Sequence, residues 1–68
     1  MIIEDEKLTA EDLAGTIASL DPEAEIVILL SSVKEAVSYF RTHSMPDLIF
    51  SDIQLGDGLS FEIFKAVN

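Results

Sequence analysis

The chain contains the stretch Asp47-Leu48-Ile49-Phe50-Ser51-Asp52, which leads directly into Ile53-Gln54-Leu55-Gly56-Asp57-Gly58. A short apolar run therefore ends at a carboxylate and a glycine-rich turn. At the start of the chain, Met1-Ile2-Ile3 leads in the same way into Glu4-Asp5-Glu6. Apolar runs of this length are typical of buried strands, and in open α/β sheets ligands bind outside the carboxyl ends of the strands. If the two strands are adjacent and parallel, Asp5 and Asp52 meet at one edge of the sheet.

The periodicity of the apolar residues predicts that strands and helices alternate along the chain. We expect strands over residues 1–4, 25–30 and 47–52, and helices over residues 8–20, from Ser32 to about residue 42, and from Ser60 onward. The expected capping residues are Thr9 with Asp12, Ser32 with Glu35, and Ser60. Alternating β-α-β-α-β-α units form parallel sheets through right-handed crossovers. The sequence therefore predicts an α/β fold with three parallel strands in the order 2-1-3 and helices on both faces.

Composition narrows the class of protein. The chain has 68 residues and a net charge of -9, and it has no cysteine. This length allows one small domain, and a domain of this size buries only about 60% of the surface of its unfolded chain. The negative charge repels phosphate backbones, so we expect no nucleic acid binding by this chain. Without a long apolar run or a signal-peptide pattern, we expect no membrane segment and a cytoplasmic location.

The two acidic strand ends carry a family resemblance. Ile2-Ile3-Glu4-Asp5-Glu6 and Asp47-Leu48-Ile49-Phe50-Ser51-Asp52-Ile53-Gln54-Leu55 resemble the receiver domain of bacterial two-component response regulators, with Asp5 and Asp52 lying 47 positions apart. The resemblance implies a flavodoxin-like receiver fold and a phosphoryl group taken from a sensor histidine kinase onto Asp52. It implies that Asp5 and, less directly, Glu4 arrange a Mg²⁺ ion, together with the backbone carbonyl of Gln54. It also implies control of an output domain. The sequence after Asp52 is similar to that of receivers in LytTR-type transcription regulators.

The residue types suit that chemistry. A carboxylate oxygen can attack a phosphoryl group and form an acyl phosphate, but the donor is strongly anionic. Neighbouring carboxylates alone would increase the repulsion. Mg²⁺ prefers octahedral oxygen ligands and neutralises charge on phosphoryl oxygens. Three acidic groups and a carbonyl at one sheet edge match this requirement.

The sequence also departs from the receiver pattern. The resemblance covers residues 1–68 as the N-terminal portion of a single receiver domain, without the fourth and fifth strands. The family's Ser/Thr and Lys, which contact the phosphoryl group, belong to that second half, and Lys65 cannot be assigned the lysine's role. Gly56 stands where the family commonly has proline, and Ser60 where it commonly has glycine. We therefore expect a truncated three-stranded sheet.

Two function classes remain open at this point. The first is a phosphoacceptor module, and the second is a noncatalytic half-receiver that pairs with itself or another chain. We expect a homodimer through the third strand, which is apolar from Leu48 to Phe50, or through a third-helix patch of Phe61, Ile63 and Phe64. We do not expect an enzyme, because the chain lacks a Gly-x-x-x-x-Gly-Lys loop and the second aspartate of aspartate-nucleophile phosphatases. Taken separately, each acidic cluster is better explained as a solvated or turn-forming group, and only their joint occurrence at this spacing favours the receiver.

Overall fold

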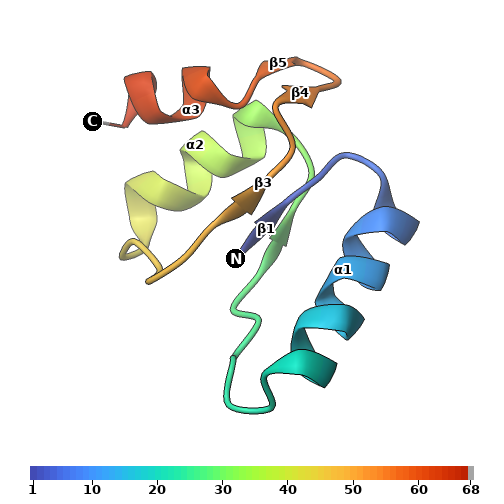
Figure 1. Cartoon of the computed structure of the whole chain (residues 1–68). Coiled ribbons are helices and arrows are strands. Elements are labelled where there is room, and N and C mark those ends of the chain that lie inside the picture. The colour runs from blue at the N-terminus through green and yellow to red at the C-terminus, as the bar shows by residue number, and fades with distance from the viewer. Residues whose placement is uncertain (68) are drawn as a thin grey trace.

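A three-stranded parallel sheet is the framework of the chain, which a computed structural model describes over residues 1–67 (Figure 1). Its strands are β1 (Ile2–Ile3), β2 (Leu29–Leu30) and β3 (Phe50–Ser51), in the order β2-β1-β3. Ile3 is in register with Leu30 on one side and with Ser51 on the other. The predicted parallel order 2-1-3 is confirmed.

The strands are much shorter than the sequence predicted. Strand β1 begins at Ile2, which is in register with Leu29 and Phe50. The expected strand residues before these two, 25–28 and 47–49, therefore extend beyond the start of β1. Backbone hydrogen bonds nevertheless extend the sheet beyond the strand ends. Ile2 N–H donates to the Ile28 carbonyl at 3.1 Å, and Phe50 N–H donates to the Met1 carbonyl at 2.9 Å. The short central strand therefore limits the length of the whole sheet.

Helices cover both faces of the sheet, as predicted. Helix α1 (Lys7–Leu20) lies on one side, and α2 (Val33–Thr42) and α3 (Phe61–Ala66) lie on the other (Figure 1). Helices α2 and α3 pack together partly through Phe40 and Phe64, whose ring centroids are 6.2 Å apart. Among the described residues, no helix has the length and apolar character needed to cross a membrane.

The helix ends match the sequence signals only in part. Ser32 caps α2, since its hydroxyl accepts a hydrogen bond from Glu35 N–H at 3.0 Å. The expected Thr9–Asp12 capping box is wrong: α1 begins at Lys7, with Glu6 as an N-cap that makes no side-chain cap bond. Ser60 is the N-cap residue of α3, but it too makes no side-chain cap bond. The chain that leaves β1 turns at once into α1, so the helix begins before the capping sequence is reached.

The core lies between the sheet and the pair α2 and α3. It consists of six buried apolar side chains. One belongs to Met1, and the other five come from β1, β2, α2, β4 and α3: Ile3, Leu30, Ala36, Leu55 and Ile63. Ile49, the residue before β3, packs against this core. On the other face of β1, Ile2 is also buried. The central strand is thus covered on both sides, as expected for a parallel sheet.

The third helix buries part of the patch that was expected to be exposed. Ile63 was expected in an exposed patch, but its side chain is fully buried, whereas Phe61 is 58% exposed. A hairpin precedes the helix and contacts it. The hairpin consists of β4 (Gln54–Leu55) and β5 (Gly58–Leu59), paired antiparallel, and the sequence analysis had placed only a turn there. Ser60 N–H closes it by donating to the Ile53 carbonyl at 2.8 Å.

The different burial of Ile63 and Phe61 gives a test of this packing. Ile63→Ala is expected to lower the free energy of unfolding by about 2–5 kcal/mol, because it removes methyl groups from a closed core. Phe61→Ala is the matched variant on the same helix and should change stability by less than about 0.5 kcal/mol, because exposed positions contribute little. Urea unfolding followed by circular dichroism measures both. A larger loss for Phe61→Ala than for Ile63→Ala would show that α3 packs through Phe61 instead.

Candidate functional site

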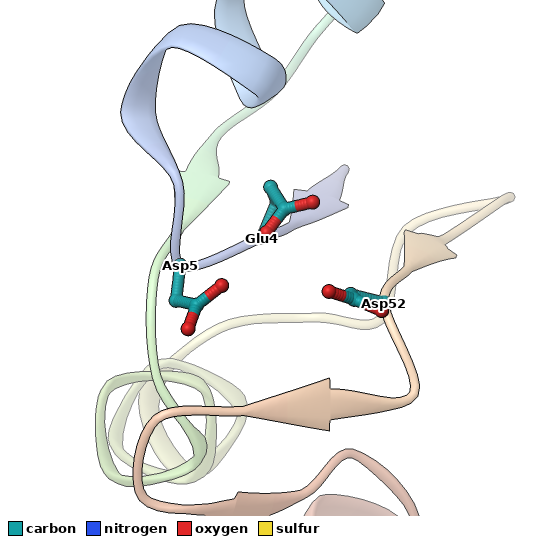
Figure 2. Close-up of side chains that lie close together, drawn as sticks. All are labelled: Glu4, Asp5 and Asp52. Carbon is teal, nitrogen blue, oxygen red and sulfur yellow. The ribbon is translucent and has the colours of Figure 1, made fainter.

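Three carboxylates meet at the carboxyl ends of β1 and β3. Glu4 and Asp5 follow β1, and Asp52 follows β3, so that residues 47 positions apart in the chain become neighbours. One side-chain oxygen from each of the three lies within 4.8 Å of the others. Figure 2 shows the three side chains around a common space at this edge of the sheet. The convergence of Asp5 and Asp52 expected from the sequence is therefore present.

The sheet itself fixes the backbone of this cluster. Asp52 N–H donates to the Ile3 carbonyl at 3.0 Å, and Glu4 N–H donates to the Leu30 carbonyl at 2.9 Å. These two bonds continue the ladders of β3 on β1 and of β1 on β2 by one residue. Glu4 and Asp52 are consequently held by rigid elements, while Asp5 begins the turn into α1.

The carboxylates repel one another, and Glu4 shows the effect. Glu6 N–H donates to Glu4 Oε2 at 3.1 Å, and this bond alone would lower the pKa of Glu4. Partial burial, a hydrogen bond with Asp5 and the negative charges of Asp52 and Asp5 act in the opposite direction. Together they outweigh the backbone bond and raise the pKa of Glu4 above its ordinary value of 4.5. The raised pKa of Glu4 indicates that its ionised form lacks a positive partner.

The cluster has the donor set and nearly the spacing of a magnesium site. Mg²⁺ binds oxygen at about 2.1 Å in octahedral geometry, which places ligand oxygens roughly 3 Å apart in adjacent positions and roughly 4 Å apart in opposite positions. The oxygens of Glu4, Asp5 and Asp52 lie within 4.8 Å of one another, so small side-chain rotations bring them to that spacing. All ligands are carboxylate oxygens, which Mg²⁺ and Ca²⁺ prefer over nitrogen or sulfur. The residues present therefore fit a hard divalent cation.

The cluster lies in an open hollow of about 660 Å³. Its lining comprises Glu4, Asp5, Glu6, Thr9, Asp52, Gln54, Leu55 and Gly56. All four residues that the sequence assigned to the metal are among them, and Thr9 lines the hollow instead of capping a helix. Gln54 lies in β4, where its pairing partner Leu59 donates its N–H to Glu62 Oε2 at 2.8 Å. That bond occupies the Leu59 N–H, so the Gln54 carbonyl is a candidate backbone ligand.

The β4–β5 hairpin forms one wall of the hollow. A Cβ atom on Gly56 would lie 3.7 Å from Asp5 Oδ2, so the hairpin tip is within contact distance of the cluster. Gly58 has a φ of 148°, a backbone conformation that side-chain-bearing residues rarely adopt. A glycine at this position lets the chain reverse directly after the acidic site.

Asp57 links the β4–β5 hairpin to helix α2. Its carboxylate accepts hydrogen bonds from Val33 N–H at 2.8 Å and from Lys34 N–H at 3.0 Å. These are unpaired donors of the first turn of α2, so Asp57 caps a helix that is 23 residues away in sequence. The bonds from Lys34 and Val33 lower the pKa of Asp57 below its ordinary value of 3.8. The sequence analysis missed this role, although Asp57-Gly58 is a turn dipeptide that places an acidic group on a loop.

Replacing Asp57 tests the link between hairpin and helix. Asp57→Asn is expected to unfold at a lower urea concentration at pH 7, because the neutral amide is a weaker acceptor for the two helix donors. Since the pKa is lowered in the folded state, the stabilisation is present above pH 3.8 and is lost as the pH falls through the folded-state pKa. The urea midpoints of wild type and variant should therefore converge toward pH 2.

Asp12→Asn is the control for this test, since it removes the same charge from an exposed position of α1. Its unfolding midpoint at pH 7 should stay close to that of the wild type. Equal midpoints for Asp57→Asn and Asp12→Asn across the whole pH range would contradict the capping role of Asp57.

Comparisons with known proteins do not assign the chain to a family. No protein-family model, no curated protein and no solved structure matches it. The chemical interpretation of the site therefore rests on its geometry and donor set.

Proposed function

We propose that this chain is the phosphoacceptor portion of a response-regulator receiver, with Asp52 as the acceptor of a phosphoryl group. The observation that supports the proposal most strongly is the meeting of Glu4, Asp5 and Asp52 within 4.8 Å at the carboxyl ends of two adjacent parallel strands. The order β2-β1-β3 is the arrangement that a truncated flavodoxin-like sheet requires. On this proposal the donor is a sensor histidine kinase, and the output domain belongs to another part of the protein.

Each residue of the site has a role in this proposal. Asp52 is exposed at the mouth of the hollow, so a phosphoryl donor can approach its carboxylate oxygen. Its backbone is held by the Ile3 carbonyl, so the nucleophile is presented from a rigid strand end. Glu4, Asp5 and the Gln54 carbonyl would hold Mg²⁺, which supplies positive charge against phosphoryl oxygens. Without such a cation, three carboxylates would repel the donor.

The proposed acceptor is expected to react slowly in the isolated chain. Preorganised donors at developing charge each contribute about 10²–10³ in rate, and the family's lysine is not among these 68 residues. Lys65 lies on α3, at the end of the helix away from the hairpin, and the hollow is lined by none of the four basic residues. The chain therefore offers an acceptor and metal ligands but no cationic side chain for the phosphoryl group.

Phosphorylation by acetyl phosphate tests the proposal directly. We expect substoichiometric addition of one phosphoryl group in the presence of Mg²⁺, measured by intact mass. Asp52→Asn and removal of Mg²⁺ with a chelator should each abolish it, whereas Asp12→Asn should leave it unchanged. Equal phosphorylation of wild type and Asp52→Asn would contradict the assignment of the acceptor.

The second candidate is a noncatalytic module that pairs through β3 or α3. Phe50 is 39% exposed and Phe61 is 58% exposed, which supports an apolar contact at one of these elements. Such a module would associate equally well as wild type and as Asp52→Asn in sedimentation equilibrium. The same variant thus separates the two candidates.

A further inference from the structure

The turn of the β4–β5 hairpin consists of two adjacent residues, Gly56 and Asp57, which lie against different parts of the molecule. A Cβ atom on Gly56 would lie 3.7 Å from Asp5 Oδ2, at the acidic cluster. Asp57 reaches the start of α2, where its carboxylate accepts hydrogen bonds from Val33 N–H at 2.8 Å and from Lys34 N–H at 3.0 Å (Figure 1). Consecutive residues therefore join the acidic hollow to the start of α2.

The hairpin is short and anchored on both sides of its turn. Leu55, just before the turn, is buried in the core. Just after the turn, Leu59 N–H donates to Glu62 Oε2 at 2.8 Å. The Gln54 carbonyl, the candidate backbone ligand, belongs to a residue only three positions before Asp57, a stretch that spans at most about 10 Å. A movement of this carbonyl toward a bound ion is therefore transmitted to Asp57.

Helix α2 begins with two separate caps. The first N–H groups of a helix have no partner within the helix. The Ser32 hydroxyl accepts a hydrogen bond from Glu35 N–H at 3.0 Å, and Asp57 takes the N–H groups of Val33 and Lys34. None of these five residues lines the acidic hollow. The two caps can therefore be removed one at a time, and only the Asp57 cap leads to the acidic hollow.

We propose that Asp57 is a positioning residue for the acidic site: by bonding to α2 it holds the hairpin where the Gln54 carbonyl and the carboxylates of Asp5 and Asp52 can share one divalent cation. This inference rests on the proposed function, since it requires a cation at that site. Coupling between two equilibria is reciprocal, so a bound cation strengthens the Asp57 cap as much as the cap strengthens cation binding. The start of α2 is then the element that responds to occupation of the site.

Titration of the labelled chain with MgCl₂, followed by amide NMR, tests the coupling. In the wild type we expect the Val33 and Lys34 amides to shift with the same dissociation constant as those of Asp5 and Asp52. In Asp57→Asn they should no longer respond, even at Mg²⁺ concentrations that saturate the Asp5 and Asp52 signals. The dissociation constant of Asp57→Asn should rise about fivefold or more, since coupling between linked sites is typically about 5–150-fold.

Ser32→Ala is the matched control, because it removes a cap from the same helix start and leaves the bonds of Asp57 in place. It should keep the wild-type dissociation constant and the response of Lys34 to Mg²⁺. A purely structural role of the α2 caps would give Ser32→Ala and Asp57→Asn the same behaviour.

Val33→Pro separates the bonds of Asp57 from its charge. It removes one of the two N–H donors and leaves the carboxylate in place. Proline is favoured at the first helical position, and Ser32 already has the extended backbone (φ -152°, ψ 163°) that suits a residue before proline. This variant should therefore fold, and its dissociation constant for Mg²⁺ should lie between those of the wild type and Asp57→Asn.

Three results would overturn the positioning role while leaving the acceptor site intact. The first is a start of α2 that does not respond in the wild type, or responds equally in Asp57→Asn, while Asp5 and Asp52 shift. The second is an equal dissociation constant for Asp57→Asn and Ser32→Ala. The third is wild-type binding by Val33→Pro, which would make the charge of Asp57 the cause. Absence of shifts at Asp5 and Asp52 in the wild type would overturn the proposed function and this inference together.

Discussion

Two backbone hydrogen bonds, from Phe50 N–H to the Met1 carbonyl and from Asp52 N–H to the Ile3 carbonyl, hold β3 against β1 in parallel register. This pairing closes a loop of nearly fifty residues, and both helices α1 and α2 lie within that loop. A shift of one residue would turn Ile49 out of the core and Phe50 into it, because side chains alternate along a strand. It would also separate Asp52 from Glu4 and Asp5. The core and the acidic cluster therefore depend on the same register.

The acidic cluster opposes this pairing electrostatically. Three carboxylates meet at one edge of the sheet, where burial, the Asp5 hydrogen bond and the charges of Asp52 and Asp5 outweigh the bond from Glu6 N–H and raise the pKa of Glu4. Burial of Ile2, Ile3, Leu30 and Ile63 favours the same arrangement, because each fully buried aliphatic side chain contributes about 1.5–3 kcal/mol. The fold thus uses apolar packing to hold like charges together. A group of this kind gains most from a bound cation, since the cation removes the repulsion that folding had to overcome.

The hairpin after Asp52 connects the site to the second layer of helices. Gly56 lies against Asp5, and Asp57 caps α2. A displacement of the hairpin tip would therefore change both the shape of the acidic hollow and the capping of the first turn of α2.

Sequence patterns were sufficient for the parts of the structure set by local rules. Alternating strands and helices predicted the parallel order, Ser32 and Glu35 predicted the start of α2, and the two acidic strand ends predicted the meeting of Asp5 and Asp52. Long-range contacts were missed. The pairing of Gln54 with Leu59 makes a hairpin from what looks like a plain turn, and on the helix that follows it Ile63 is buried whereas Phe61 is exposed. The cap that Asp57 provides to α2 joins residues that no local pattern relates.

The acidic cluster is a cation site only if a divalent ion binds where the three carboxylates meet. Titration of the isotope-labelled chain with MgCl₂ at constant ionic strength, followed by amide NMR, measures this most directly. The account predicts saturable shifts at millimolar Mg²⁺ for Asp5, Asp52 and Gln54, which vanish in Asp52→Asn, while the amides of Val27 and Leu48 stay in place. Absence of shifts at Asp5 and Asp52, or equal shifts in Asp52→Asn, would contradict it.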